Sequence, residues 1–114
     1  MTYRMFIDDE RFPVEGDTAI IVRSSDEAKS VMEKQGCPSF ISFDHDLGGA
    51  DTSMELIHWM IRQDLDLLAH GFIFIPNDFK FDVHSQNPIG AKNIAGLLNS
   101  YLQFRNSENG NICT

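Results

Sequence analysis

Short apolar runs alternate with amphipathic stretches along this chain, and that alternation restricts its fold more than any other feature. The runs are four or five residues long, the usual length of a buried strand, and lie at residues 3–7, 19–22, 40–43 and 79–83. Residues 10–17, between the first two, contain a proline and a glycine and are predicted to be a loop. Strands that alternate with helices pair in parallel through right-handed crossovers. The sequence therefore predicts an α/β fold, a three-layer sandwich with helices on both faces of a parallel sheet.

Two of the intervening stretches carry the signals of helices. Residues 24–27, Ser-Ser-Asp-Glu, form a capping box for a helix that we expect to end near Gln35. Thr52 or Ser53 can cap a second helix, in which apolar residues recur at helical spacing through about Leu68.

The segment after the second helix has two interpretations. Residues 72–75 have as much strand character as residues 79–83, so we expect a sheet of four to five strands. A flavodoxin-like or receiver-like strand order is the natural choice, and it brings the ends of the first and third strands side by side. We choose 79–83 as the strand that matters, because it leads directly into His84. Asn87 is then expected to cap a last helix, with a proline in its first turn.

Length and composition predict a single domain. The chain has 114 residues, of which 42% are hydrophobic, enough for one core. We expect the domain to span residues 1–105 and residues 106–114 to form a loose polar tail. No apolar stretch reaches the roughly 18 to 20 residues of a membrane span, and the N-terminus lacks the pattern of a signal peptide. We therefore expect a cytoplasmic protein that does not bind membranes, with its two cysteines reduced.

The charge of the chain restricts its partners. A formal net charge of −8 argues against extended nucleic-acid binding, which requires a basic face. No P-loop, dinucleotide-binding or serine-hydrolase motif is present. We expect the partner to be a small phosphorylated ligand or an RNA end.

Acidic residues directly follow two of the predicted strands. Asp8 and Asp9 come after the first strand and Asp44 after the third, so three carboxylates converge at one sheet edge. Such carboxylates repel one another unless a proton or a cation lies between them. Oxygen ligands of this kind suit Mg²⁺ or Mn²⁺. The sequence therefore predicts a metal site at Asp8, Asp9 and Asp44, whereas Asp46 is explained equally well as a turn cap.

Two histidines lie near the same edge. His45 and His84 could serve as base and acid, because imidazole exchanges protons near neutral pH. The helix that begins at Asn87 offers backbone N–H groups to a phosphate. Arg11 can donate a bidentate pair to the same phosphate, or form a surface salt bridge to an acidic neighbour.

Three sequence blocks resemble the cyclic-phosphate-processing receiver domain family. They are IDDERFP at residues 7–13, SFDHDLG at residues 42–48 and VHSQNPIGAKNI at residues 83–94, in this order. The last block is the most specific, and together they span most of the chain. The resemblance implies a variant of the response-regulator receiver fold that acts on cyclic phosphates of RNA ends or nucleotides.

The resemblance also implies roles for individual residues. Asp8 and Asp9 match the acidic pair that holds the metal in receivers, Asp44 matches the phospho-acceptor position, and Ser85 falls near the receiver hydroxyl residue. A receiver's conserved lysine has no evident counterpart here, which weakens a signalling interpretation. The residues that match the family's own motifs, and that we expect in the pocket, are Arg11, His84, Asn87 and Asn93.

The leading hypothesis is a metal-dependent phosphoesterase that opens cyclic phosphates. Asp8, Asp9 and Asp44 would hold Mg²⁺ or Mn²⁺, and His45 and His84 would transfer protons, with Asp44 also at the reacting centre. The substrate-binding residues would be Arg11, Ser85, Asn87 and Asn93. Two alternatives remain: a signalling receiver phosphorylated on Asp44, and a protein that binds a cyclic nucleotide without cleaving it.

Overall fold

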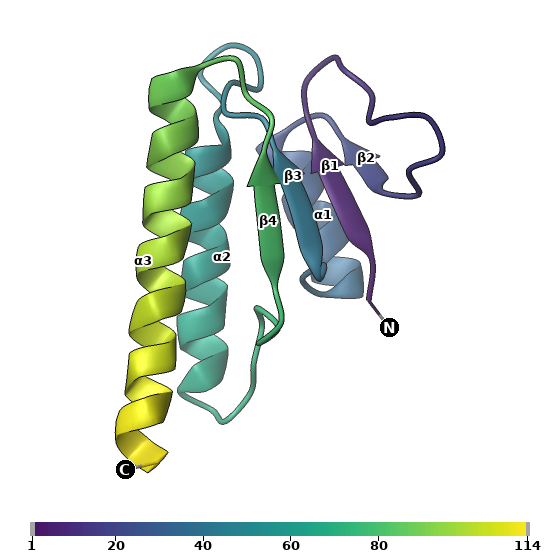
Figure 1. Cartoon of the computed structure of the whole chain (residues 1–114). Coiled ribbons are helices and arrows are strands. Elements are labelled where there is room, and N and C mark those ends of the chain that lie inside the picture. The colour runs from purple at the N-terminus through teal and green to yellow at the C-terminus, as the bar shows by residue number, and fades with distance from the viewer. Residues whose placement is uncertain (1, 114) are drawn as a thin grey trace.

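A four-stranded parallel sheet forms the centre of the fold in the computed structural model, which describes residues 2–113 and the side chains of residues 2–107. The strand order is β2-β1-β3-β4, and every pair is parallel (Figure 1). The strands are β1 (Arg4–Ile7), β2 (Ile20–Val22), β3 (Phe40–Phe43) and β4 (Lys80–Val83). The predicted α/β class and receiver-like strand order are confirmed, as is the choice of the run at 79–83 as a strand.

The strands end level with one another at their carboxyl edge. Ile7 is paired with Phe43, and Phe43 with Val83. The hydrogen-bond ladder continues past the strands, with one more bond between the ends of β1 and β3 and one between the ends of β3 and β4. The amide of Asp44 donates to the carbonyl of Ile7 at 2.9 Å, and the amide of His84 donates to that of Phe43 at 2.9 Å. The first polar residue after each strand is therefore fixed by the sheet itself.

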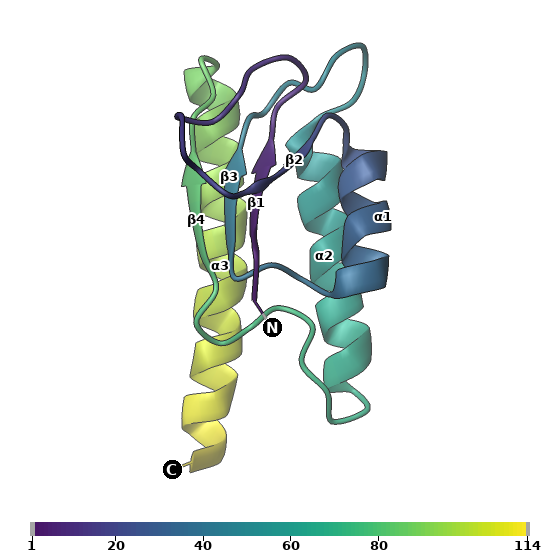
Figure 2. The ribbon, with the colours of Figure 1, turned by 90° about the vertical axis from the view of Figure 1, so that its right-hand side faces the viewer.

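Three helices accompany the sheet: α1 (Ser25–Gln35), α2 (Ser53–Leu68) and α3 (Pro88–Cys113). Helices α1 and α2 cover one face of the sheet, whereas α3 lies along the edge beyond β4 and packs against α2 (Figures 1 and 2). The connection between β1 and β2 is a loop, as its proline and glycine predicted, where a doubly wound sheet usually has a helix.

The hydrophobic core fills the space between the sheet and the helices. Alternate residues of β1 and β3 point into it, because successive side chains of a strand face opposite sides. The largest fully buried apolar side chains are Met5, Ile7, Val22, Met32, Ile41, Phe43, Leu56, Ile57, Met60, Ile75, Ile94 and Leu98. None of the helices in the described part of the chain is long and apolar enough to pass through a membrane.

The predicted helix starts are confirmed, although their caps differ. Ser24 Oγ accepts the amide of Glu27 at 3.0 Å, as a capping box requires. Asn87 Oδ1 accepts the amide of Gly90 at 2.9 Å and caps α3. Thr52 makes no side-chain cap; instead the amide of Ser53 donates to a backbone carbonyl of the preceding turn.

The segment at residues 72–75 is a loop, so its interpretation as a possible fifth strand is wrong. Phe72 and Ile73 are exposed, and the amides of Phe74 and Ile75 donate to Asp64 Oδ1 of α2 at 3.1 and 2.9 Å. A buried carboxylate therefore satisfies backbone donors that a strand would have used in the ladder.

Helix α3 continues through residues 106–113, the segment that we expected to form a loose polar tail. The last turns before that stretch are anchored by Arg105, whose guanidinium donates to Asp64 Oδ2 and to the carbonyl of Ile75, each at 2.9 Å. The apolar periodicity of the sequence did not reveal this anchor, because the anchor is a polar pair, Asp64 of α2 and Arg105 of α3.

Candidate functional site

Asp8 is the most enclosed acidic residue at the carboxyl edge of the sheet. Its Oδ1 accepts the amides of Glu10 at 3.0 Å and Arg11 at 2.9 Å, which turns the chain sharply away from β1. Its Oδ2 lies 3.0 Å from Nε of Arg11 and 3.0 Å from Nε2 of His84. Burial alone raises the pKa of Asp8, but these donors and the arginine charge outweigh it and hold the pKa below the ordinary value of 3.8. Asp8 is therefore a carboxylate at neutral pH.

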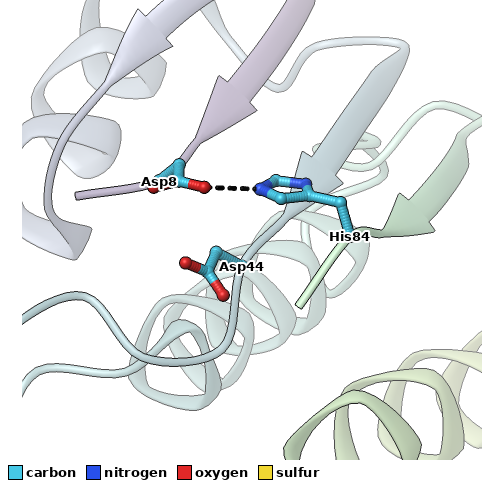
Figure 3. Close-up of side chains that lie close together, drawn as sticks. All are labelled: Asp8, Asp44 and His84. Atoms are coloured by element: carbon cyan, nitrogen blue, oxygen red, sulfur yellow. Dashed lines mark hydrogen bonds and ion pairs between the residues drawn. The ribbon is translucent and has the colours of Figure 1, made fainter. Parts of the chain in front are cut away.

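His84 reaches Asp8 from the end of β4, across the end of the intervening strand β3 (Figure 3). Its Nδ1 lies 2.8 Å from Ser42 Oγ, and its ring stacks on Phe6 with the centroids 4.5 Å apart. Both ring nitrogens are thus engaged and the ring plane is fixed. The imidazole is held in one orientation by three strands.

Asp44 completes a compact cluster with these two residues. Its side chain is only 9% exposed, and its Oδ2 lies 3.4 Å from Nη2 of Arg11. The potential ligand atoms of Asp8, Asp44 and His84 all lie within 4.8 Å of one another, close enough to hold one metal ion. The guanidinium of Arg11, whose side chain is 41% exposed, bridges the two carboxylates.

A polar cleft of about 240 Å³ opens above this cluster. Its lining residues come from the loop after β1, the loop after β3 and the turn before α3: Asp9, Glu10, Arg11, Asp44, Asp46, Ser85, Gln86 and Asn87. Asp9 is exposed and lies outside the three-residue cluster. It lies beside Gly48, whose φ of +92° is a backbone conformation that favours glycine.

One rim of the cleft is a chain of hydrogen bonds between β3 and α3. His45 Nδ1 lies 3.1 Å from Asp46 Oδ1, and Asn87 Nδ2 donates to Asp46 Oδ2 at 3.2 Å. These two bonds lower the pKa of Asp46. The ring of His45 lies against Gly90, where a Cβ would come within 2.4 Å of the ring. Asp46 therefore orients His45, and only glycine at position 90 leaves room for the ring.

The fold brings together most of the residues that the sequence singled out. Asp8, Asp44, His84 and Arg11 are in direct contact, and the cleft is also lined by three further predicted residues: Asp9, Ser85 and Asn87. His45 lies at the rim, and neither it nor His84 lines the cleft itself. Asn93 is exposed on α3, apart from the lining residues, so the structure gives it no contact with this site.

Sequence reasoning missed two residues that hold parts of the site in place. Arg23 directly follows β2, and its Nη1 donates to the carbonyls of Asp8 at 3.1 Å and Arg11 at 2.5 Å, which holds the loop above β1. Ser42 lies within β3 and binds His84. A signal existed for Arg23, because a basic residue at the end of a strand next to β1 is near the same edge. Ser42 had none, since its role depends on which strand lies between β1 and β4.

The chain was compared with known proteins and structures. No curated protein and no solved structure matches it. The profile of the cyclic-phosphate processing receiver domain matches residues 3–100, which include all four strands and the whole site. The chain therefore belongs to the cyclic-phosphate processing receiver domain family.

Proposed function

We propose that this protein is a metal-dependent phosphoesterase that opens a cyclic phosphodiester bound in the polar cleft. One observation carries the proposal: a largely buried cluster of Asp8, Asp44 and His84 lies beneath a polar cleft that Arg11 lines. The family is linked to the processing of cyclic phosphates, which gives the class of substrate. A 2′,3′-cyclic RNA end and a cyclic nucleotide are the two substrates that we consider.

The donor set fits a divalent cation. Two carboxylates and an imidazole offer ligand atoms within 4.8 Å of one another, and the carboxylates already require the positive charge of Arg11. We assign Asp8 and Asp44 as the direct ligands, with Mg²⁺ or Mn²⁺ as the ion. A bound ion would supply a Lewis acid and a water of lowered pKa. Asp9 lies outside the cluster, so we no longer assign it as a direct ligand.

The phosphate would be held by groups that line the cleft. Arg11 supplies a planar fork of N–H donors, which matches two phosphate oxygens. Ser85 and Asn87, which directly precede α3, also line the cleft. The dipole of the helix favours an anion at that position.

Proton transfer is assigned to His45. Its Nδ1 is bound to Asp46, and within the described part of the chain no hydrogen bond engages its Nε2. A base whose second nitrogen is oriented by a carboxylate is the usual arrangement for activating a nucleophile. His84 is instead engaged through both nitrogens, by Asp8 and Ser42, so we assign it to holding the acidic cluster.

The proposal is tested by incubating the purified protein with 2′,3′-cyclic CMP and with RNA that ends in a 2′,3′-cyclic phosphate. We expect a phosphomonoester product with Mn²⁺ or Mg²⁺ and none with EDTA, measured by chromatography. His45→Ala should lower the rate by roughly 10²- to 10⁴-fold, the usual contribution of a positioned base. The exposed His70 serves as the control, and His70→Ala should keep the wild-type rate.

Two other outcomes are informative. If neither compound is cleaved with either metal, the assignment as a phosphoesterase is wrong. If calorimetry then shows tight binding and the ligand is recovered unchanged, the protein is a non-catalytic receptor for cyclic nucleotides.

A further inference from the structure

The carboxylate of Asp8 already accepts three hydrogen bonds and forms one ion pair. The amides of Glu10 and Arg11 donate to Oδ1, and Nε2 of His84 is bonded to Oδ2. The guanidinium of Arg11 is paired with Oδ2 as well, with its Nε 3.0 Å away. A carboxylate has about four lone-pair sites, so a cation at Asp8 would compete with Arg11 for the last of them and for the negative charge.

The side chain of Arg11 is the donor that can leave. The two amides belong to the turn that follows β1, and the ring of His84 is fixed by Ser42 and by its stack on Phe6. The Arg11 side chain is 41% exposed, and its contact with Asp44 is long, at 3.4 Å. Its guanidinium also supplies the positive charge that a metal ion would otherwise provide to the two carboxylates.

We propose that Arg11 is the resident counter-ion of the acidic cluster and exchanges with a divalent cation, so that its guanidinium becomes available to the phosphate. This inference rests on the proposed function, because it concerns the same metal and the same phosphate. Without metal, a phosphate must draw Arg11 away from Asp8 and Asp44 and leave two enclosed carboxylates without this counter-ion. With metal bound, that cost is absent. Metal and phosphate should therefore bind with positive coupling that passes through Arg11.

The test measures Mn²⁺ binding without any substrate turnover. The EDTA-treated and dialysed protein is titrated with Mn²⁺, and free Mn²⁺ is followed by electron paramagnetic resonance. Arg11→Gln removes the competitor and should bind Mn²⁺ more tightly than wild type, by roughly 5- to 150-fold, the usual range of coupling between sites. Arg4→Gln is the matched control: it removes one exposed arginine from the start of β1 and should leave Mn²⁺ affinity unchanged.

A second titration adds inorganic phosphate. In wild type, phosphate should tighten Mn²⁺ binding, whereas in Arg11→Gln this effect should be smaller because the guanidinium is gone. Equal coupling in both proteins would mean that phosphate contacts the metal alone, which overturns the transfer of Arg11. Mn²⁺ affinity in Arg11→Gln that is equal to or weaker than that of wild type overturns the exchange itself.

Two measurements protect the test against a folding defect. Arg11→Gln leaves the carboxylates unpaired, so we expect a lower Tm in EDTA and a larger rise with Mn²⁺ than in wild type. Arg11→Lys keeps the charge but lacks the fork that spans Asp8 and Asp44, and should show intermediate Mn²⁺ affinity. If the protein did not cleave cyclic phosphates but Arg11→Gln bound Mn²⁺ more tightly than wild type, the exchange would still be supported. Catalysis with unchanged Mn²⁺ affinity in Arg11→Gln would refute the exchange and leave the proposed function intact.

Discussion

His84 Nε2 lies 3.0 Å from Asp8 Oδ2, although the two residues are 76 positions apart and follow strands that are not neighbours. Strand β3 lies between them, and its Ser42 holds the other ring nitrogen at 2.8 Å. One imidazole therefore ties together the ends of three strands. The geometry of the acidic cluster depends on the register of the sheet as much as on the residues themselves.

Ser42 should matter for metal binding, although it does not line the cleft. We expect Ser42→Ala to weaken Mn²⁺ binding by roughly 10- to 100-fold, because it releases the imidazole that orients the Asp8 carboxylate, and residues that orient a metal ligand usually have an effect of this size. Mn²⁺ titration measures the effect. Ser39→Ala, on the residue before β3, is the control and should bind as wild type does. Identical affinities for the two variants would show that His84 needs no support from Ser42.

Gly90 should be required by His45. In Gly90→Ala the new Cβ would meet the His45 ring, so the ring must move away from Asp46 and turnover of cyclic phosphate should fall. Gly96→Ala, on the same helix, has open space around its Cβ and should keep activity. It should also stabilise the protein by ~0.5–1 kcal/mol, the helix preference of alanine over glycine. Both variants are compared by rate assays and urea unfolding; equal activity would mean that the position of His45 is not critical.

Asp64 should stabilise the fold in a pH-dependent way. Burial raises its pKa, but bonds from Tyr101, the amide of Ile75 and Arg105 outweigh this and lower the pKa below 3.8. The stability that Asp64 contributes is therefore fully present above about pH 3.8 and is lost as the pH falls through its folded-state pKa. Asp64→Asn leaves Arg105 buried without its partner and should reduce the free energy of unfolding by about 3–5 kcal/mol at pH 7.

Urea unfolding at pH 7 and at pH 3 checks this expectation. The difference between wild type and Asp64→Asn should shrink at the lower pH, where the wild-type carboxylate loses its advantage. Asp66→Asn changes an exposed residue of the same helix and should have little effect at either pH. A difference that is the same at both pH values would show that packing, and not charge, explains the effect of the substitution.

Asp44 should not become phosphorylated if the proposed function is right. Its carboxylate is nearly enclosed and is paired with Arg11, and the sequence shows no counterpart of the receiver lysine. We expect no mass increase after incubation with acetyl phosphate and Mg²⁺, measured by mass spectrometry of the intact protein. A labile phosphoryl adduct that is lost in Asp44→Asn would instead favour a signalling receiver.

Local signals in the sequence account for most elements and for the acidic residues at their ends. Caps at Ser24 and Asn87 predict two helix starts, because they depend on neighbours within four residues. The apolar runs predict the strands, and the acids after them are then directed to one edge by parallel pairing. That is why Asp8 and Asp44 could be assigned to one site in advance.

Contacts between distant residues were decided only by the tertiary structure. Asp64 binds the backbone of residues 74–75 and Arg105, so a run with strand character became a loop and a polar segment continued a helix. Residue types alone do not reveal such pairing, because it forms across ten or more positions of the chain. The same reason explains why Arg11 could be named for the cleft, while its place between Asp8 and Asp44 emerged only when β1 and β3 were paired.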